Sequence, residues 1–182
     1  MVLLEKLLVY RSKYPSEGEM VRKFIDLLEA DAGCFSRNGA SGHLTGSAWV
    51  VDESCTKTLL VHHRKLGKWI QPGGHADSER DLFRVALREL REETGLSGVR
   101  GHRDEIFDID IHLIPESEAE VAHYHYDVRF LLIAKDTSAK IKPSDESHDV
   151  RWIELDRLEE FTCEDSILRM RRKCIAQRSK KH

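Results

Sequence analysis

The sequence predicts a layered α/β (α+β) domain preceded by a helical hairpin, and three observations lead to this fold class. Apolar residues recur at helical spacing before residue 40, strand-like runs follow from residue 43, and one amphipathic run at 80–94 interrupts those strands. Strands that surround a helix, with another helix closing the chain, are typical of layered folds in which helices cover a sheet.

Two helices are predicted first, at residues 2–13 and 16–31. Apolar residues recur three or four positions apart in both segments, and Pro15 between them suits a helix start. The pair therefore predicts an αα-hairpin. A stretch rich in Gly, Ser and Asn follows, so we expect an N-terminal helical extension at 1–40 and the main domain at 41–182.

The strands and the remaining helices are predicted next along the chain. Apolar and β-branched residues at 43–52 and 57–64 flank a polar turn and predict a hairpin. The helix at 80–94 is expected to end at Gly95, because glycine is the usual residue after a helix C-terminus. Further strands are predicted at 105–114, 122–134 and 150–155, and a final helix at 163–177.

Composition and charge limit the classes of function. With 182 residues, 40% hydrophobic and 34% charged, the chain suits one globular domain with an appendage. A net charge of -3 gives no general attraction to nucleic acid or to an anionic membrane, so we expect neither as a partner. The four cysteines are scattered without a CxxC pair, which favours reduced thiols and a cytoplasmic location.

The helix at 80–94 carries an unusual group of like charges. Glu89, Glu92 and Glu93 lie three and four positions apart and therefore project from one face of the helix. Such repulsion costs about 0.2–0.5 kcal/mol for each i,i+4 pair, unless a cation is bound. Mg²⁺ prefers oxygen ligands and is usually held by a few carboxylates together with substrate phosphates, so the cluster predicts a divalent metal site. The alternative is a solvated acidic helix face.

The segment GGHADSERDLFRVALRELREETGL, residues 73–96, resembles the Nudix box, whose pattern is G-x5-E-x7-R-E-U-x-E-E-x-G-U with U aliphatic. The residues that carry the resemblance are Gly74, Arg88, Glu89, Leu90, Glu92, Glu93, Gly95 and Leu96. In the order of strands and helices the resemblance extends from about residue 42 to 177, and the first 40 residues lie outside it.

The resemblance implies an α/β/α sandwich with a mixed sheet and a site for Mg²⁺ or Mn²⁺. Its metal ligands would be Glu89, Glu92 and Glu93, joined by the Gly74 carbonyl, and the three glutamates would be catalytic. The implied activity is that of a pyrophosphohydrolase, with water attacking phosphorus in a nucleoside diphosphate linked to another moiety. Homodimers are common in the family, so a homodimer is one arrangement that we consider.

One position departs from the Nudix pattern. The first glutamate of the box should stand six residues after Gly74, where this chain has Arg80, flanked by Glu79 and Asp81. We interpret this position as structural or as lying outside the direct metal ligands. The alternative is a Nudix-like domain that binds a nucleotide without turning it over and serves as a sensor or regulator.

A general base is expected from outside the box. Glu146 lies in the loop before the strand at 150–155 and is the favoured candidate, while Glu118 and Glu120 lie in an earlier acidic loop. The alternative is that all three are ordinary solvated charges.

Two strands carry polar faces that favour substrate binding. His123, His125 and Arg129 share one face of the strand at 122–134, because every second residue of a strand points the same way. If this strand pairs with the one at 105–114, Arg129 would serve phosphate and the histidines of the strand a sugar or base. His75, beside the glycines, would approach the phosphates from the other side. A solvent-facing sheet surface and a separate histidine metal site are the alternatives.

Overall fold

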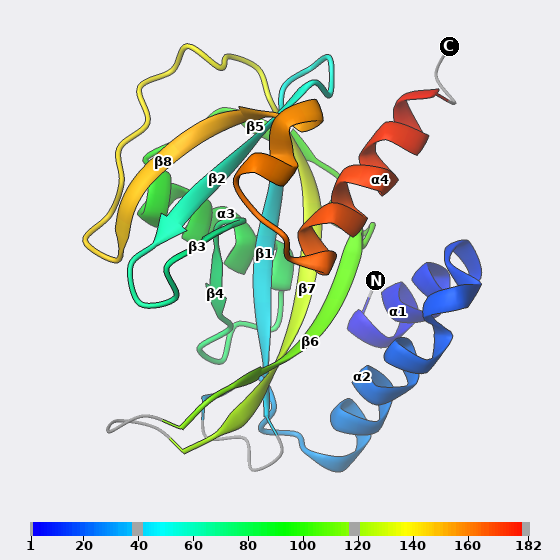
Figure 1. Cartoon of the computed structure of the whole chain (residues 1–182). Coiled ribbons are helices and arrows are strands. Elements are labelled where there is room, and N and C mark those ends of the chain that lie inside the picture. The colour runs from blue at the N-terminus through cyan, green and yellow to red at the C-terminus, as the bar shows by residue number, and fades with distance from the viewer. Residues whose placement is uncertain (1, 38–41, 117–120, 180–182) are drawn as a thin grey trace. The chain divides into compact units, whose positions relative to one another are not determined.

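The structure is a computed structural model that describes residues 2–37, 42–116 and 121–179 (Figure 1). Its chain forms two compact units. The first unit comprises Met1–Ser47, Gly74–Ala86 and Arg103–Phe130, and the second comprises Ala48–Gly73, Leu87–His102 and Leu131–His182. Four elements, β1, β4, α3 and β7, contribute residues to both units.

The helical hairpin in the first unit is as predicted. It consists of α1 (Leu3–Lys13), a short 3-10 turn η1 (Pro15–Glu17) and α2 (Gly18–Ala30). Phe24 of α2 is fully buried and makes an edge-to-face contact with Tyr126 of β7 at a centroid distance of 5.2 Å. Lys6 of α1 donates a hydrogen bond of 2.7 Å from Nζ to the Arg103 carbonyl. The hairpin therefore packs against other segments of the first unit.

Strands β6 (Asp108–Ile114) and β7 (His123–Ala134) pair with each other, as a shared polar face requires, and the pairing is antiparallel. Asp108 stands opposite Arg129, and His112 stands opposite His125. Because the side-chain period of a strand is two residues, this register places the polar side chains of both strands on one face. The long-range pairing thereby gathers acidic, basic and histidine side chains in the first unit.

Strand β1 (His43–Val51) is buried along its whole length. Gly46 in this strand lies against the beginning of α3 (Leu82–Thr94). A Cβ atom at position 46 would come within 2.6 Å of the Leu82 carbonyl oxygen and 3.0 Å of Val85 Cβ. Only a residue without a side chain allows this close approach of strand and helix.

The second unit contains the predicted hairpin and two further antiparallel pairs. The hairpin joins β1 to β2 (Lys57–His63), with Val50 opposite Leu59. Strand β2 also pairs with β3 (Lys68–Ile70) and, along its full length, with β8 (Ser147–Glu154), whose pairing can be followed in Figure 1. The short strand β5 (Val99–Gly101) pairs with the end of β7.

After β8 the chain forms a 3-10 helix η2 (Leu155–Glu160) and the final helix α4 (Asp165–Ser179). Hydrogen bonds link the described strands in the order β3-β2-β1-β7-β5, with β4 (Gly73–His75) on β1, β6 on β7 and β8 on β2. This mixed sheet with helices confirms the predicted α/β (α+β) class. Within the described residues, no helix combines the length and apolar character that spanning a membrane requires.

Three short strands were not predicted, and one of them contains the glycine pair. Gly73 and Gly74 belong to β4, a segment for which the sequence predicted no element. Like β3 and β5, this strand has three residues, which is too short for an alternating pattern of polar and apolar side chains to show.

Candidate active site

The helix α3 carries the predicted metal-binding glutamates on its second half. Its apolar residues Val85, Ala86 and Leu90 are buried, so they fix which face of the helix packs inward. The helix ends as predicted at Gly95, whose φ of +69° is a backbone conformation that favours glycine. The last turn is held by the Gly95 N–H, which donates to the Arg91 carbonyl at 2.9 Å.

The three helix glutamates differ in exposure within the second unit. Glu93 is only 7% exposed, the Glu89 side chain is 15% exposed, and Glu92 is exposed. The backbone N–H of Gly73 donates a hydrogen bond of 3.1 Å to Glu93 Oε2. The sequence pointed to the adjacent Gly74, but it did not predict the hydrogen bond from Gly73 to Glu93. The glycine pair was the only local pattern in this segment that pointed to a close backbone contact.

Burial and neighbouring negative charges raise the pKa of Glu93 to about 8. Burial is the largest cause, and the charges of Glu89, Glu146 and Glu92 add to it, while the Gly73 hydrogen bond acts in the opposite direction. The structure thus brings the four predicted catalytic glutamates into one electrostatically coupled group. We call Glu89, Glu92, Glu93 and Glu146 the acidic cluster.

Glu146 reaches this group from the turn before β8. Arg64, which follows β2, holds the turn by donating from its backbone N–H to the Glu146 carbonyl at 2.8 Å and from Nε to the Asp145 carbonyl at 3.0 Å. On α3, the Arg88 guanidinium donates to Glu89 Oε1 at 2.8 Å. The side chain of Glu146 itself is exposed and open to solvent.

The residues of the acidic cluster fit a divalent cation of the Mg²⁺ type. They offer carboxylate oxygens, which such ions prefer, and ionised Glu93 is destabilised by three like charges that a cation would offset. Gly74 belongs to the first unit, and the role of its carbonyl as a metal ligand stays a prediction.

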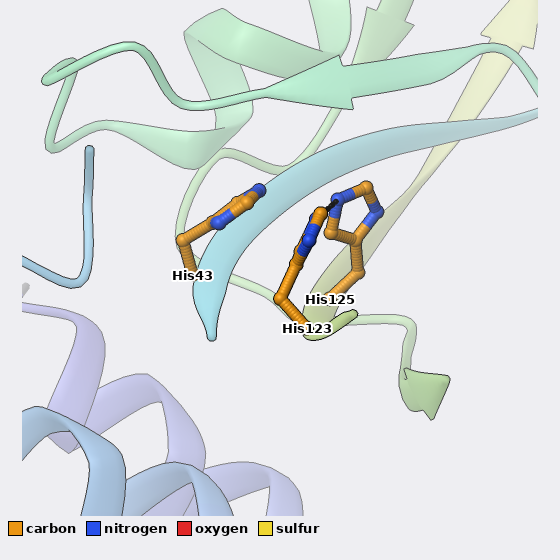
Figure 2. Close-up of side chains that lie close together, drawn as sticks. All are labelled: His43, His123 and His125. Carbon is orange, nitrogen blue, oxygen red and sulfur yellow. Dashed lines mark hydrogen bonds between the residues drawn. The ribbon is translucent and has the colours of Figure 1, made fainter. Parts of the chain in front are cut away.

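The first unit brings together three of the predicted substrate-binding residues. His75 Nε2 and His123 Nε2 each lie 3.2 Å from His125 Nε2. His43 of β1, which was not singled out in the sequence, stacks on His123 with ring centroids 4.8 Å apart (Figure 2). His112 of β6 contacts His125 edge to face at 5.3 Å. We call these five residues the histidine cluster.

Burial, as the largest cause, and the four surrounding histidines together lower the pKa of His125 to about 2. His125 is therefore neutral across the physiological pH range. His43 could not be found from the sequence, because its place beside β7 depends on a pairing between distant segments.

Arg129, the fourth predicted substrate-binding residue, is 3% exposed and surrounded by carboxylates. Its guanidinium contacts Asp127 at 2.7 Å, Asp108 at 3.2 Å and Asp110 at 3.3 Å. Thr45 of β1 also donates to Asp127, at 2.9 Å. A phosphate would have to displace these carboxylates, and its contact with Arg129 stays a prediction.

Arg80, which replaces the first glutamate of the Nudix box, makes contacts within the first unit. The Arg80 guanidinium lies over the Phe35 ring, 5.2 Å from its centroid. Neighbouring Glu79 accepts a hydrogen bond of 2.9 Å from the Asp81 N–H. The other two candidates for a general base, Glu118 and Glu120, lie outside the described residues.

Comparison with known proteins identifies the family. The family model described as the NUDIX domain matches residues 43–173, which include the acidic cluster. This chain belongs to the Nudix family. The match covers well over half of the chain and confirms the resemblance in the box at residues 73–96.

Several curated proteins share the Nudix region at moderate identity. A probable DHNTP pyrophosphohydrolase of Lactococcus lactis is 29% identical over 100 residues, which are 54% of this chain and 58% of that protein. The asymmetrical bis(5'-nucleosyl)-tetraphosphatase of mouse is 29% identical over 112 residues, or 58% and 69% of the two chains. The human nucleoside diphosphate-linked moiety X motif 6 is 43% identical over 61 residues, which are 32% of this chain and 19% of that protein.

Solved Nudix structures share the fold. An Ap4A hydrolase of Caenorhabditis elegans in a binary complex superposes with a TM-score of 0.58 at 18% identity, covering 73% of this chain and 95% of the other. A Nudix-family hydrolase of Clostridium perfringens gives a TM-score of 0.55 at 21% identity, with coverage of 74% and 97%. At these identities the likeness shows a common fold.

Proposed function

We propose that this Nudix chain is a metal-dependent pyrophosphohydrolase that cleaves a nucleoside diphosphate linked to another moiety. The observation that carries the proposal is the buried Glu93, which lies among Glu89, Glu92 and Glu146 inside the segment that the family model matches. The names of the relatives, a pyrophosphohydrolase and a tetraphosphatase, support hydrolysis of a phosphoric anhydride.

Glu89, Glu92 and Glu93 would hold the Mg²⁺ or Mn²⁺. When bound, such an ion neutralises charge on the substrate phosphates and lowers the pKa of water. The chain contributes the positions of these carboxylates. The Gly73 N–H fixes one oxygen of Glu93, and the burial of Glu93 keeps its side chain from turning out to solvent.

Glu146 is the residue that we assign as general base. Its side chain is exposed, so its carboxylate is open to the attacking water and would accept the proton of that water. The water oxygen forms a bond to phosphorus, the bond from phosphorus to the bridging oxygen breaks, and the leaving phosphate keeps the electron pair. Arg64 positions the turn that carries Glu146.

The test is product formation from nucleoside diphosphate sugars, dinucleoside polyphosphates and nucleoside triphosphates, with Mg²⁺, Mn²⁺ or EDTA. Reaction in ¹⁸O-labelled water should place the label on one phosphate product. Because Glu92 is exposed, Glu92→Gln should fold normally and lower kcat by about 10²-fold or more. Glu19→Gln, at an exposed site on α2, is the matched control. Unchanged turnover in Glu92→Gln would contradict the assignment of α3.

One observation favours the second candidate function, a Nudix domain that binds a nucleotide without hydrolysing it. Arg80 replaces the first glutamate of the box, and its guanidinium rests on Phe35. A sensor would show a thermal shift with nucleotides but no product from any substrate of the panel. Metal-dependent product formation would exclude a domain that only binds nucleotides.

The other predictions from the sequence are carried forward as part of the proposal. They comprise substrate contacts by His75, His123, His125 and Arg129, a cytoplasmic location, a homodimer, no nucleic-acid or membrane partner, and the division at residues 40 and 41.

A further inference from the structure

We propose that the histidine cluster of the first unit is a second metal site, which binds a transition-metal ion such as Zn²⁺ through His43, His123 and His125, with His75 as the fourth ligand. This site is chemically distinct from the acidic cluster. It is independent of hydrolysis, because its ligands are four imidazoles rather than carboxylates.

The spacing of the ring nitrogens supports this site. Two tetrahedral ligands at a Zn–N distance of about 2.0–2.1 Å lie about 3.3 Å apart. The Nε2 atoms of His75 and His123 are each 3.2 Å from Nε2 of His125. One ligand nitrogen from each of His43, His123 and His125 falls within 4.8 Å of the others. The two 3.2 Å distances therefore match the spacing of ligands that share one ion.

Hydrogen bonding alone does not explain the contacts at His125 Nε2. A ring nitrogen carries either one proton or one lone pair, so it makes one good in-plane hydrogen bond. His125 Nε2 has two nitrogen neighbours at 3.2 Å. A cation between the Nε2 atoms of His75, His123 and His125 would bind the lone pairs of all three nitrogens.

The contacts of His123 prepare it for metal binding. Its Nδ1 lies 2.8 Å from the Val121 carbonyl oxygen, which can only accept a hydrogen bond. Nδ1 therefore carries the proton, and Nε2 presents its lone pair toward His125. Histidines that bind metals are commonly oriented in this way, by donating from the other ring nitrogen to a carbonyl or carboxylate.

The strands hold the ligands in place before any ion binds. His43 is 2% exposed at the start of β1, and His123 and His125 project from one face of β7, so the three rings gather on the same side of these strands (Figure 2). Next to them on β6, His112 Nδ1 lies 3.5 Å from Asp110 Oδ2. An all-imidazole ligand set favours Zn²⁺, Co²⁺, Ni²⁺ or Cu²⁺ over Mg²⁺, which prefers oxygen.

Four protein ligands would leave no position open for water or substrate. Metal sites closed in this way are structural rather than catalytic. We therefore assign the ion the role of joining β1 to β7 in the first unit, and expect its binding to raise the thermal stability of the protein.

The test uses Co²⁺ and Zn²⁺ with the full chain after chelator treatment. Glu92→Gln/Glu93→Gln removes two of the three carboxylate ligands proposed on α3 and serves as the background. In this background we expect one equivalent of Co²⁺ to bind with the strong visible absorption of a four-coordinate ion, and Zn²⁺ to displace it. Zn²⁺ should also raise Tm.

Adding His125→Asn to this background should weaken Co²⁺ binding at least 100-fold and abolish both the visible band and the Tm shift. His123→Gln, at a half-buried position, is the second variant should His125→Asn fail to fold. His102→Asn, at an exposed histidine outside the cluster, should change nothing. Retained binding in both cluster variants, or no binding in the background protein, would overturn the proposal.

Discussion

The two groups of carboxylates in this molecule are built in opposite ways. In the first unit, Asp108, Asp110 and Asp127 surround the buried guanidinium of Arg129. In the second unit, Glu93 is buried among other glutamates, and its pKa rises to about 8. One group includes its cation as a side chain, whereas in the other the buried Glu93 binds its proton more tightly than a free carboxylate does.

The difference indicates which group is suited to take a cation from solution. A buried ion pair already satisfies its carboxylates, so a metal would have to compete with the guanidinium. A buried carboxylate among like charges gains when a divalent ion arrives, because the ion offsets both the repulsion and the cost of burial. Acidic residues alone therefore do not mark a metal site, because a buried guanidinium such as that of Arg129 can already lie among them.

The largest expected effect comes from removing the internal cation. Arg129→Met removes the guanidinium that offsets the charges of Asp108 and Asp127, which are 0% and 2% exposed. We expect the free energy of unfolding at pH 7 to fall by about 3–5 kcal/mol, as for other broken buried ion pairs. Urea denaturation measures the change. Arg84→Met, at a side chain that is 67% exposed, should cost less than about 1 kcal/mol. Equal losses in both variants would contradict the comparison.

The second effect concerns turnover. Glu93→Gln keeps the shape of the side chain but removes its charge, so the Gly73 hydrogen bond can persist while metal affinity falls. We expect kcat/KM to decrease by about 10²–10³-fold at saturating Mg²⁺, measured with whichever substrate the panel identifies. If Glu93→Gln lowered kcat/KM no more than Glu19→Gln does, Glu93 would not belong to the active site.

The third effect is on stability in the absence of metal. Folding raises the pKa of Glu93 from 4.5 to about 8, so between these pH values the folded state binds more protons than the unfolded state. The stability contributed by protonated Glu93 is therefore present below pH 4.5 and is lost as pH rises toward 8. Glu93→Gln avoids this loss.

The variant should match the wild type near pH 4.5 and exceed its free energy of unfolding by on the order of 1–4 kcal/mol at pH 9. Urea denaturation in EDTA at several pH values measures the difference, and Mg²⁺ should narrow it at pH 8. Parallel profiles for the two proteins would show that Glu93 titrates normally.

The smallest effect is expected at the position that departs from the Nudix box. The Arg80 guanidinium lies over Phe35, which indicates a packing role. Arg80→Glu should therefore change kcat/KM less than tenfold. An increase of tenfold or more would show that the missing glutamate limits metal binding, and Arg80→Gln would then separate charge removal from the added carboxylate.

Local sequence patterns were sufficient to predict much of the fold and the helix that carries three of the candidate glutamates. Helix α3 was predicted within two residues at its start, because apolar spacing, the glutamates and Gly95 all lie within one continuous segment. The polar faces of β6 and β7 followed from alternation, and their pairing is confirmed.

What could not be predicted depends on contacts between distant segments. His43 lies 80 residues before His123, and only the arrangement of the strands brings their rings to 4.8 Å. Arg129 looked available for phosphate because its strand neighbours are polar, but the register places Asp108 directly opposite. The sequence carries no local signal for either contact.

Gly46 has a consequence for how this chain can diversify. Any other residue there would have to move the strand or the start of α3, since a Cβ would lie 2.6 Å from the Leu82 carbonyl oxygen. In a saturation library, position 46 should accept no substitution unless a second change displaces the first turn of the helix. Directed evolution of this protein toward new substrates will therefore proceed with that strand-helix distance held constant.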